Sequence, residues 1–277
     1  MKKFLKWTGI VSGGLSGLVL LAGVALYPLG MKKLTRTYPN LPVETVNIPA
    51  GPDAIARGKH VSVIWACTKC HGTDLSGTLI TNDPIEGTTP ILGTIPASNL
   101  TSGNGGVGQS YTDTDWVRAI RHGVKPGGQV DFIMFNFSTM GDQDLGDLIA
   151  YLKQIPPDDT NYPKIHFGPV IPIFPAIGIF TPAAELIDHN ASHPTDPIPG
   201  VTIEYGKYLS AICSGCHGKG IANVVTKWTQ DDFIRTIHTG VLPDGSQLGP
   251  TMSSNTFREM NDTELAAIWL YFRSLSH

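Results

Sequence analysis

The sequence predicts a mainly α-helical protein, in which an N-terminal transmembrane helix is followed by two homologous helical domains with loop-rich connectors. Three observations predict this arrangement. Residues 8–31 carry no charged side chain, three sequence blocks occur twice in the same order, and prolines gather between the two copies. The 277 residues are 41% hydrophobic and 16% charged. Such a composition is typical of a chain that buries hydrophobic cores, and its length suits about two domains.

The uncharged N-terminal segment is long enough to cross a membrane. Its 24 residues would form a helix of roughly 36 Å, against a hydrocarbon core of about 30 Å. The apolar region of an export signal is shorter, about 7–15 residues. Cleavage near Ala25 is the alternative, but a retained anchor over residues 1–37 is favoured.

The rest of the chain contains an internal repeat. Each copy begins with Gly-Lys before a Cys-x-x-Cys-His motif, continues with an Asp-aromatic-aliphatic-Arg pattern, and ends with an amphipathic segment. The repeat predicts two homologous domains, residues 53–157 and 201–277. The matched positions are Gly58 and Gly206, Cys67 and Cys213, Asp115 and Asp232, and Asp144 and Glu264.

Each copy predicts a helix leading into the cysteine motif and two helices after it. Thr112-x-x-Asp115 and Thr229-x-x-Asp232 are helix-start patterns, in which a hydroxyl caps free backbone N–H groups. Apolar residues recur on one face of the last helix in each copy, which indicates core packing. The predicted helices after the motifs are residues 113–123, 142–154, 230–239 and 262–275.

Three segments read as connectors. The first copy has about 26 additional residues between Gly72 and Ser110, rich in glycine, threonine and asparagine, which predict loops. Residues 158–200 form a proline-rich linker, and such segments act as semi-rigid spacers. Residues 38–52 form a similar stem between the membrane and the first domain.

The charge distribution excludes nucleic acid as a partner. Six of the 20 basic side chains precede residue 38, and no acidic one does, which leaves 14 basic against 23 acidic side chains beyond it. An acidic surface does not neutralise a phosphate backbone. It favours basic protein partners, which opposite charge would attract.

All four cysteines fall in two Cys-x-x-Cys-His motifs, the attachment signature of c-type haem. Two cysteines on one turn can each bond a haem vinyl group, and the adjacent histidine then reaches the iron. A zinc site would need four converging ligands, and a redox dithiol needs no following histidine. We therefore predict two covalently bound haem c groups. The predicted attachment residues are Cys67, Cys70, His71, Cys213, Cys216 and His217.

Haem attachment also predicts the orientation in the membrane. Haem c is attached outside the cytoplasmic membrane, so both haem domains are expected on the periplasmic side. Lys2, Lys3 and Lys6 then lie inside. The protein is predicted to cross the inner membrane once.

With these motifs, residues 53–157 and 201–277 resemble the class I cytochrome c family, specifically its membrane-anchored di-haem members. In that family a glycine of the first helix lets it cross closely against an aromatic residue of the last helix. The resemblance implies these roles for Gly58 with Tyr151, and for Gly206 with Tyr271.

The resemblance further implies a methionine as upper iron ligand, shortly before the last helix. Met252 matches this position in the second copy. In the first copy Met140 aligns with Met260, and Met260 lies too close to the start of the last helix to be the ligand. Met134 is therefore the favoured ligand in the first copy, and Met140 is the alternative. The implied iron ligands are His71, Met134, His217 and Met252.

Other polar residues have two interpretations each. Arg118 and Arg235 occupy matched helix positions and either pair with haem propionates or lie on a solvated helix face. The remaining histidines are expected at the surface or in packing, with His122 the best outside candidate for an iron ligand.

A histidine–methionine pair saturates the iron and raises its potential, as suits an electron carrier. The sequence therefore predicts a membrane-anchored electron relay that is not itself an enzyme and serves redox partners or a respiratory or dehydrogenase complex. The alternative is a di-haem peroxidase, which requires an open ligand position at one haem.

Overall fold

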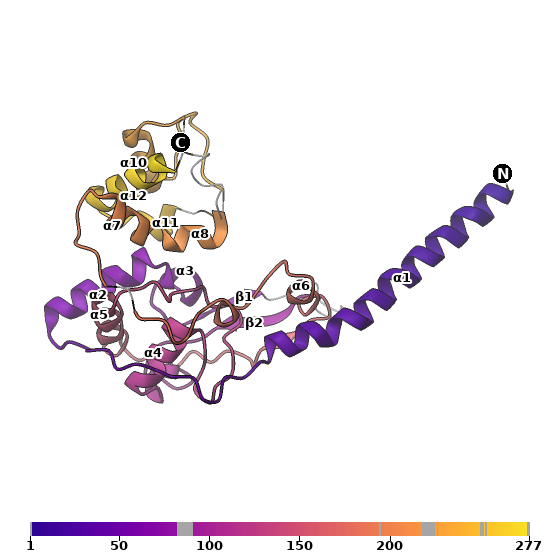
Figure 1. The fold of residues 1–277 in the computed structure, drawn as a ribbon, viewed down its shortest axis with the longest axis horizontal. Helices are drawn as coiled ribbons and strands as arrows, with labels where there is room; N and C mark the ends of the chain where they lie inside the picture. The colour runs from indigo at the N-terminus through magenta and orange to yellow at the C-terminus, as the bar shows by residue number, and fades with distance from the viewer. Residues whose placement is uncertain are drawn as a thin grey trace.

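The computed structural model describes residues 2–81, 91–193, 195–217, 225, 227–249, 252 and 254–275. The protein is mainly helical, as predicted. Figure 1 shows a long N-terminal helix, α1 (Lys2–Leu34), projecting from a body in which the C-terminal helices form a second layer above α2, α3 and α5.

Helix α1 has the features of a transmembrane anchor. Within the described residues, Trp7–Leu34 is long and apolar enough to cross a membrane. Its side chains are exposed along most of the helix, whereas Gly30 and Leu34 are buried against the body. Among the described residues, the buried positions of α1 therefore lie in its last turns.

The first helical unit contains α2 to α5. Helix α2 crosses α5 where a Cβ built on Gly58 would lie 1.9 Å from the Asp147 carbonyl oxygen and 2.8 Å from Cβ of Tyr151. The close contact expected at Gly58 and Tyr151 is thereby confirmed. The bounds are α2 (Pro52–Ile64), α3 (Cys67–His71), the 3₁₀ helix η1 (Val107–Gln109), α4 (Asp113–His122) and α5 (Asp142–Leu152).

The second helical unit, α7 to α12, repeats this arrangement. A Cβ on Gly206 would lie 1.9 Å from the Ala267 carbonyl oxygen, so α7 crosses α12 as α2 crosses α5, although Tyr271 is not among the nearest contacts. Both predicted threonine caps are confirmed: Thr112 and Thr229 form capping boxes. The bounds are α7 (Ile203–Leu209), α8 (Ala211–His217), α10 (Gln230–Thr239), α11 (Ser254–Phe257) and α12 (Asp262–Ser274).

Part of the segment expected to be loops forms a small antiparallel sheet. Strands β1 (Thr78–Thr81) and β2 (Gly93–Ala97) pair with each other, and β2 also pairs with β3 (His166–Phe167) from the linker. Strand pairing with a distant partner, rather than local turn residues, decides the conformation here.

The linker folds back onto the first unit instead of acting as a spacer. The Asn99 side-chain amide donates to the carbonyl oxygens of Asp158 (2.7 Å) and Thr160 (3.1 Å). Further along, α6 (Ile173–Ala176) lies beside the end of α1, and η2 (Ala183–Glu185) follows it. The proline-rich sequence is therefore held by the Asn99 side-chain amide and by strand pairing.

Candidate haem site

The first helical unit encloses a cleft with about 980 Å³ of empty space, part of it open to solvent. Helix α3 supplies Cys67, Cys70 and His71 to its wall, and the loop before α5 supplies Met134. The structure thus brings together four residues that the sequence predicted for one site.

The local backbone fixes the orientation of the His71 imidazole. Ala66 adopts a left-handed conformation (φ 58°), which ends α2 and starts α3 in a new direction. Nδ1 of His71 then lies 2.8 Å from the Ser98 carbonyl oxygen and donates to it, which leaves the lone pair on Nε2. Burial lowers the pKa of His71 and so favours the neutral imidazole that binds metal.

Two methionines reach the cleft but differ in packing. Met140 is fully buried, and its N–H donates to the Phe137 carbonyl oxygen; Met260 is also buried and donates in the same way to Phe257. Met134 is only half-buried at the cleft wall. Met140 and Met260 are therefore buried members of the core, whereas Met134 packs against the core from the cleft wall.

The cleft fits a haem by its chemistry. Its wall is mostly apolar, with Ile120, Phe137 and Leu148 on it, and it offers two thiols, an imidazole and two thioethers. The indole N–H of Trp116 is buried there without a hydrogen-bond partner among the described residues. Buried donors normally have partners, so an acceptor on a bound group would complete this wall.

Arg118 and Arg235, the two matched arginines, each form an ion pair within their own helix. Arg118 pairs with Asp115, and Arg235 Nη2 lies 2.6 Å from Asp232 Oδ1, in both cases one turn back. Arg118 is not among the residues that line the cleft. Lys125 is the basic side chain on the cleft wall, a residue that the repeat did not single out because it lies in a turn.

The second unit presents a matching motif. Cys213 and His217 lie on α8 and are half-buried, as is Met252, which packs against the core. The side chain of Cys216 lies outside the described residues, as do residues 218–224. A cleft in this unit is therefore not described.

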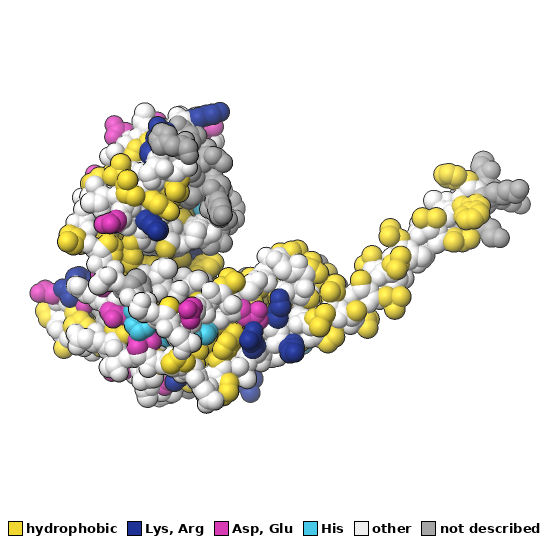
Figure 2. All heavy atoms as spheres, in the orientation of Figure 1, with side chains coloured by type: hydrophobic (Ala, Val, Ile, Leu, Met, Phe, Trp, Pro, Cys, Tyr) yellow, Lys and Arg dark blue, Asp and Glu magenta, His cyan; other side chains and the backbone are white. Residues whose placement is uncertain are grey.

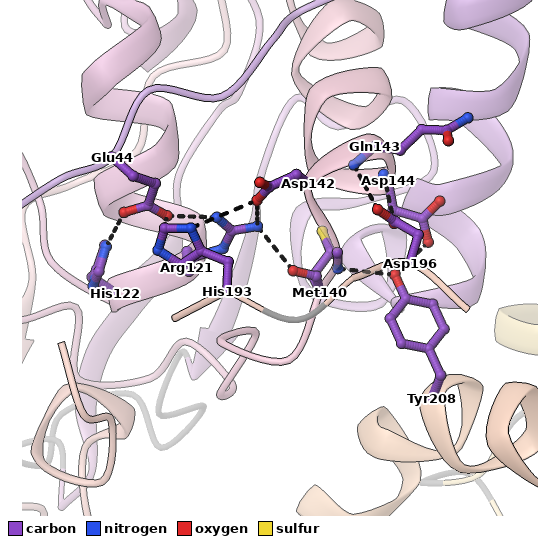
Figure 3. A network of polar contacts seen from close by, with 11 residues as sticks. Glu44, Arg121, His122, Met140, Asp142, Gln143, Asp144, His193, Asp196 and Tyr208 are labelled. Carbon is purple, nitrogen blue, oxygen red and sulfur yellow. Dashed lines mark hydrogen bonds and ion pairs between the residues drawn. The ribbon is translucent and has the colours of Figure 1, made fainter. Parts of the chain in front are cut away.

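A buried polar network holds the loop that precedes α5 (Figure 3). Arg121 donates to Glu44 Oε1 (2.5 Å) and to the Met140 carbonyl oxygen (2.9 Å), while His122 Nε2 lies 2.9 Å from Glu44 Oε2. His122 thus takes part in packing, as the other histidines were expected to do, and does not line the cleft. Burial opposes ionisation of Glu44, but hydrogen bonds from His122 and Arg121 outweigh it and lower its pKa to about 2.

Comparisons with known proteins agree with this geometry. Over 84% of its length the chain is 23% identical to the "Fructose dehydrogenase cytochrome subunit" of Gluconobacter japonicus, and the match covers 55% of that protein. The chain thus spans about half the length of this relative. Residues 55–156, which contain the cleft and the first cysteine motif, match the family described as cytochrome c. Residues 55–156 are therefore similar to a cytochrome c domain.

Proposed function

We propose that this protein is a membrane-anchored di-haem c-type cytochrome that relays single electrons between redox partners. The observation that carries the proposal is the convergence of Cys67, Cys70, His71 and Met134 on one apolar cleft. A cytochrome c domain and a likeness to the cytochrome subunit of a dehydrogenase support an electron-transfer role.

Each residue of the first site has a role in this proposal. Cys67 and Cys70 form thioether bonds to the haem, and His71 binds the iron through Nε2, since Nδ1 is engaged by Ser98. Met134 would be the second iron ligand, because the fully buried Met140 belongs to the core. The bound haem supplies one-electron redox chemistry, and a histidine–methionine pair raises its potential.

A second haem is proposed in the C-terminal unit. Cys213, Cys216 and His217 form its attachment motif and Met252 its upper ligand. The support is the repeated order of elements: α7, α8, α10 and α12 follow one another as α2, α3, α4 and α5 do. Residues 53–157 and 201–277 would then be the two cytochrome domains.

We further propose that α1 anchors the protein in the inner membrane with both haem domains on the periplasmic side. The apolar helix supports the anchor, and haem attachment outside the cytoplasm supports the orientation. By analogy with its relative, the protein would act as a subunit or partner of a dehydrogenase or respiratory complex.

The haem count tests the proposal. Pyridine haemochrome absorbance per mole of purified chain should give two haems. The variant Cys67→Ala/Cys70→Ala should retain one haem, and so should the matched variant Cys213→Ala/Cys216→Ala. A parent chain with one haem, unchanged by the second variant, would overturn the di-haem proposal. A chain without covalent haem would overturn the function altogether.

A further inference from the structure

The linker contains a second apolar segment, at the base of α1. No charged side chain occurs between residues 167 and 184, and residues 168–180 carry no polar side chain at all. Three prolines and two glycines interrupt residues 168–180, and α6 within this run spans only Ile173–Ala176. The segment therefore does not form a membrane-spanning helix, although it is as apolar as one.

Direct contacts place this segment beside the last turns of α1. A Cβ built on Gly30 would lie 1.5 Å from the Pro172 carbonyl oxygen, so the two backbones touch. Lys33 Nζ donates to the Pro175 carbonyl oxygen at 2.9 Å. From Trp7 to Gly30 a helix spans roughly 36 Å, slightly more than the hydrocarbon core. With α1 across a bilayer, Pro172 and Pro175 would lie at the outer boundary of that bilayer.

The tip of the segment exposes large apolar side chains at that level. Ile177 is 51% exposed and Ile179 is 70% exposed. Phe180 and Ile171, on either side of the tip, pack into a small core with Leu34 of α1. The tip is thus attached firmly at both ends, and Figure 2 shows hydrophobic side chains gathered at the base of α1, beside basic ones.

The backbone of the tip suits a lipid environment. The N–H groups of residues 173, 174 and 176–179 all donate to carbonyl oxygens within the segment. Irregular backbone is normally excluded from lipid because its unpaired N–H and C=O groups lose their hydrogen bonds to water there. With these donors satisfied, the tip can enter the interface at low cost.

We propose that residues 173–179 insert into the lipid headgroup–acyl boundary beside α1, as a second, shallow membrane contact. The lipid surface is the favoured occupant because the patch continues the lipid-facing surface of α1 at its outer end. Lys32, at the same level and exposed, would reach anionic headgroups. The contact would hold the first cytochrome unit against the membrane. The inference rests on the proposed membrane anchoring of α1.

Spin-label accessibility in vesicles tests this inference. The full-length holoprotein is reconstituted alone in phosphatidylethanolamine–phosphatidylglycerol vesicles, with a nitroxide on Ile177→Cys or Ile179→Cys. Ile203→Cys is the matched control: this isoleucine is 47% exposed at the start of α7, across the body from α1. Leu20→Cys, in the middle of α1, is the lipid reference. The parent chain, labelled in the same way, gives the background.

The ratio of oxygen to nickel-chelate collision rates should be several-fold higher at positions 177 and 179 than at 203, and lower than at 20. Ratios at 177 and 179 equal to that at 203 would overturn the inference. A lipid-like ratio at position 20 in that case would leave the anchor standing, whereas a water-like ratio there would overturn the anchoring too. An unchanged haem spectrum in each variant verifies that it has folded.

Discussion

Tyr208 of α7 donates a hydrogen bond from its hydroxyl group to Oδ2 of Asp144, at the start of α5, over 2.6 Å. The same hydroxyl oxygen accepts from the N–H of Gly141 at 3.1 Å. The two helical units are therefore joined at the N-terminus of α5, where Figure 3 also shows Asp196 accepting from backbone N–H groups of that helix. The positive end of the helix dipole favours such acceptors.

A second contact mirrors the first. His60 Nε2 of α2 lies 2.6 Å from Glu264 Oε1, at the start of α12. His60 and Tyr208 each lie two residues after the glycine at which their helix crosses another, and Asp144 and Glu264 occupy the same position in their helices. The interface is thus built like that of a two-fold dimer, with each unit offering one donor and one carboxylate.

Tyr208→Phe should destabilise the protein by about 1.5–3 kcal/mol, the range for a hydrogen bond to a charged group. The ring would keep its edge-on contact with Trp65, at 5.4 Å between centroids, so the loss would report the hydroxyl group. Denaturant unfolding in detergent measures the change. Tyr162→Phe, a matched change beside Gly77, should have a smaller effect. Equal losses in the two variants would contradict the assignment.

The His60–Glu264 contact should weaken as the pH rises. The hydrogen bond with Glu264 raises the pKa of His60 above its usual value of about 6.5, although partial burial opposes this. The contribution to folding is then fully present below about pH 6.5 and is lost as the pH rises through the raised pKa. The stability difference between the parent and His60→Gln should therefore shrink from pH 6 to pH 9. A constant difference over this range would refute the prediction.

The acid sensitivity of the first unit should depend on Glu44. With a pKa of about 2 in the folded protein and about 4.3 unfolded, its stabilising contribution is present above about pH 4.3 and is lost as the pH falls toward 2. Glu44→Gln leaves the buried Arg121 with less compensation and should cost about 3 kcal/mol at pH 7. The stability difference between the parent and Glu44→Gln, measured in denaturant titrations, should decline between about pH 4.3 and 2. A difference that does not change over this range would contradict the prediction.

The features of the fold that the sequence could predict are those set by local residue patterns. Thr112 and Thr229 lie three residues before aspartates that complete capping boxes, so the helix starts were visible in the chain itself. The position of β3 was not, since His166 pairs with Thr94 more than 70 residues earlier. The contact between the two helical units could not be predicted either, because the matched residues His60 and Tyr208 differ in type and neither belongs to a motif.

The candidate haem site likewise combines residues that a local motif predicts with residues whose role depends on the folded structure. The cysteines and histidines stand in a motif whose spacing is fixed by chemistry, and they could be named from the sequence. Trp116 could not, because its role depends on an indole N–H left without a partner on the cleft wall. Its matched residue, Phe233, has no such group. The choice between Met134 and Met140 likewise depends on burial, which spacing alone does not give.

Replacing each of these methionines by leucine should separate ligand from core residue. Met134→Leu removes the thioether at the half-buried position, so the methionine–iron absorption band should fall by about half for two proposed sites, and one midpoint potential should drop. Met140→Leu conserves volume in a fully buried position and should keep the band, at a cost below about 1.5 kcal/mol. Oxidised-state spectra and redox titration of the holoprotein measure both effects. A band lost with Met140→Leu and kept with Met134→Leu would reverse the assignment.

A parent that shows the band at one haem alone and turns over peroxide would favour the peroxidase alternative, since an iron without methionine offers the open position that peroxide needs.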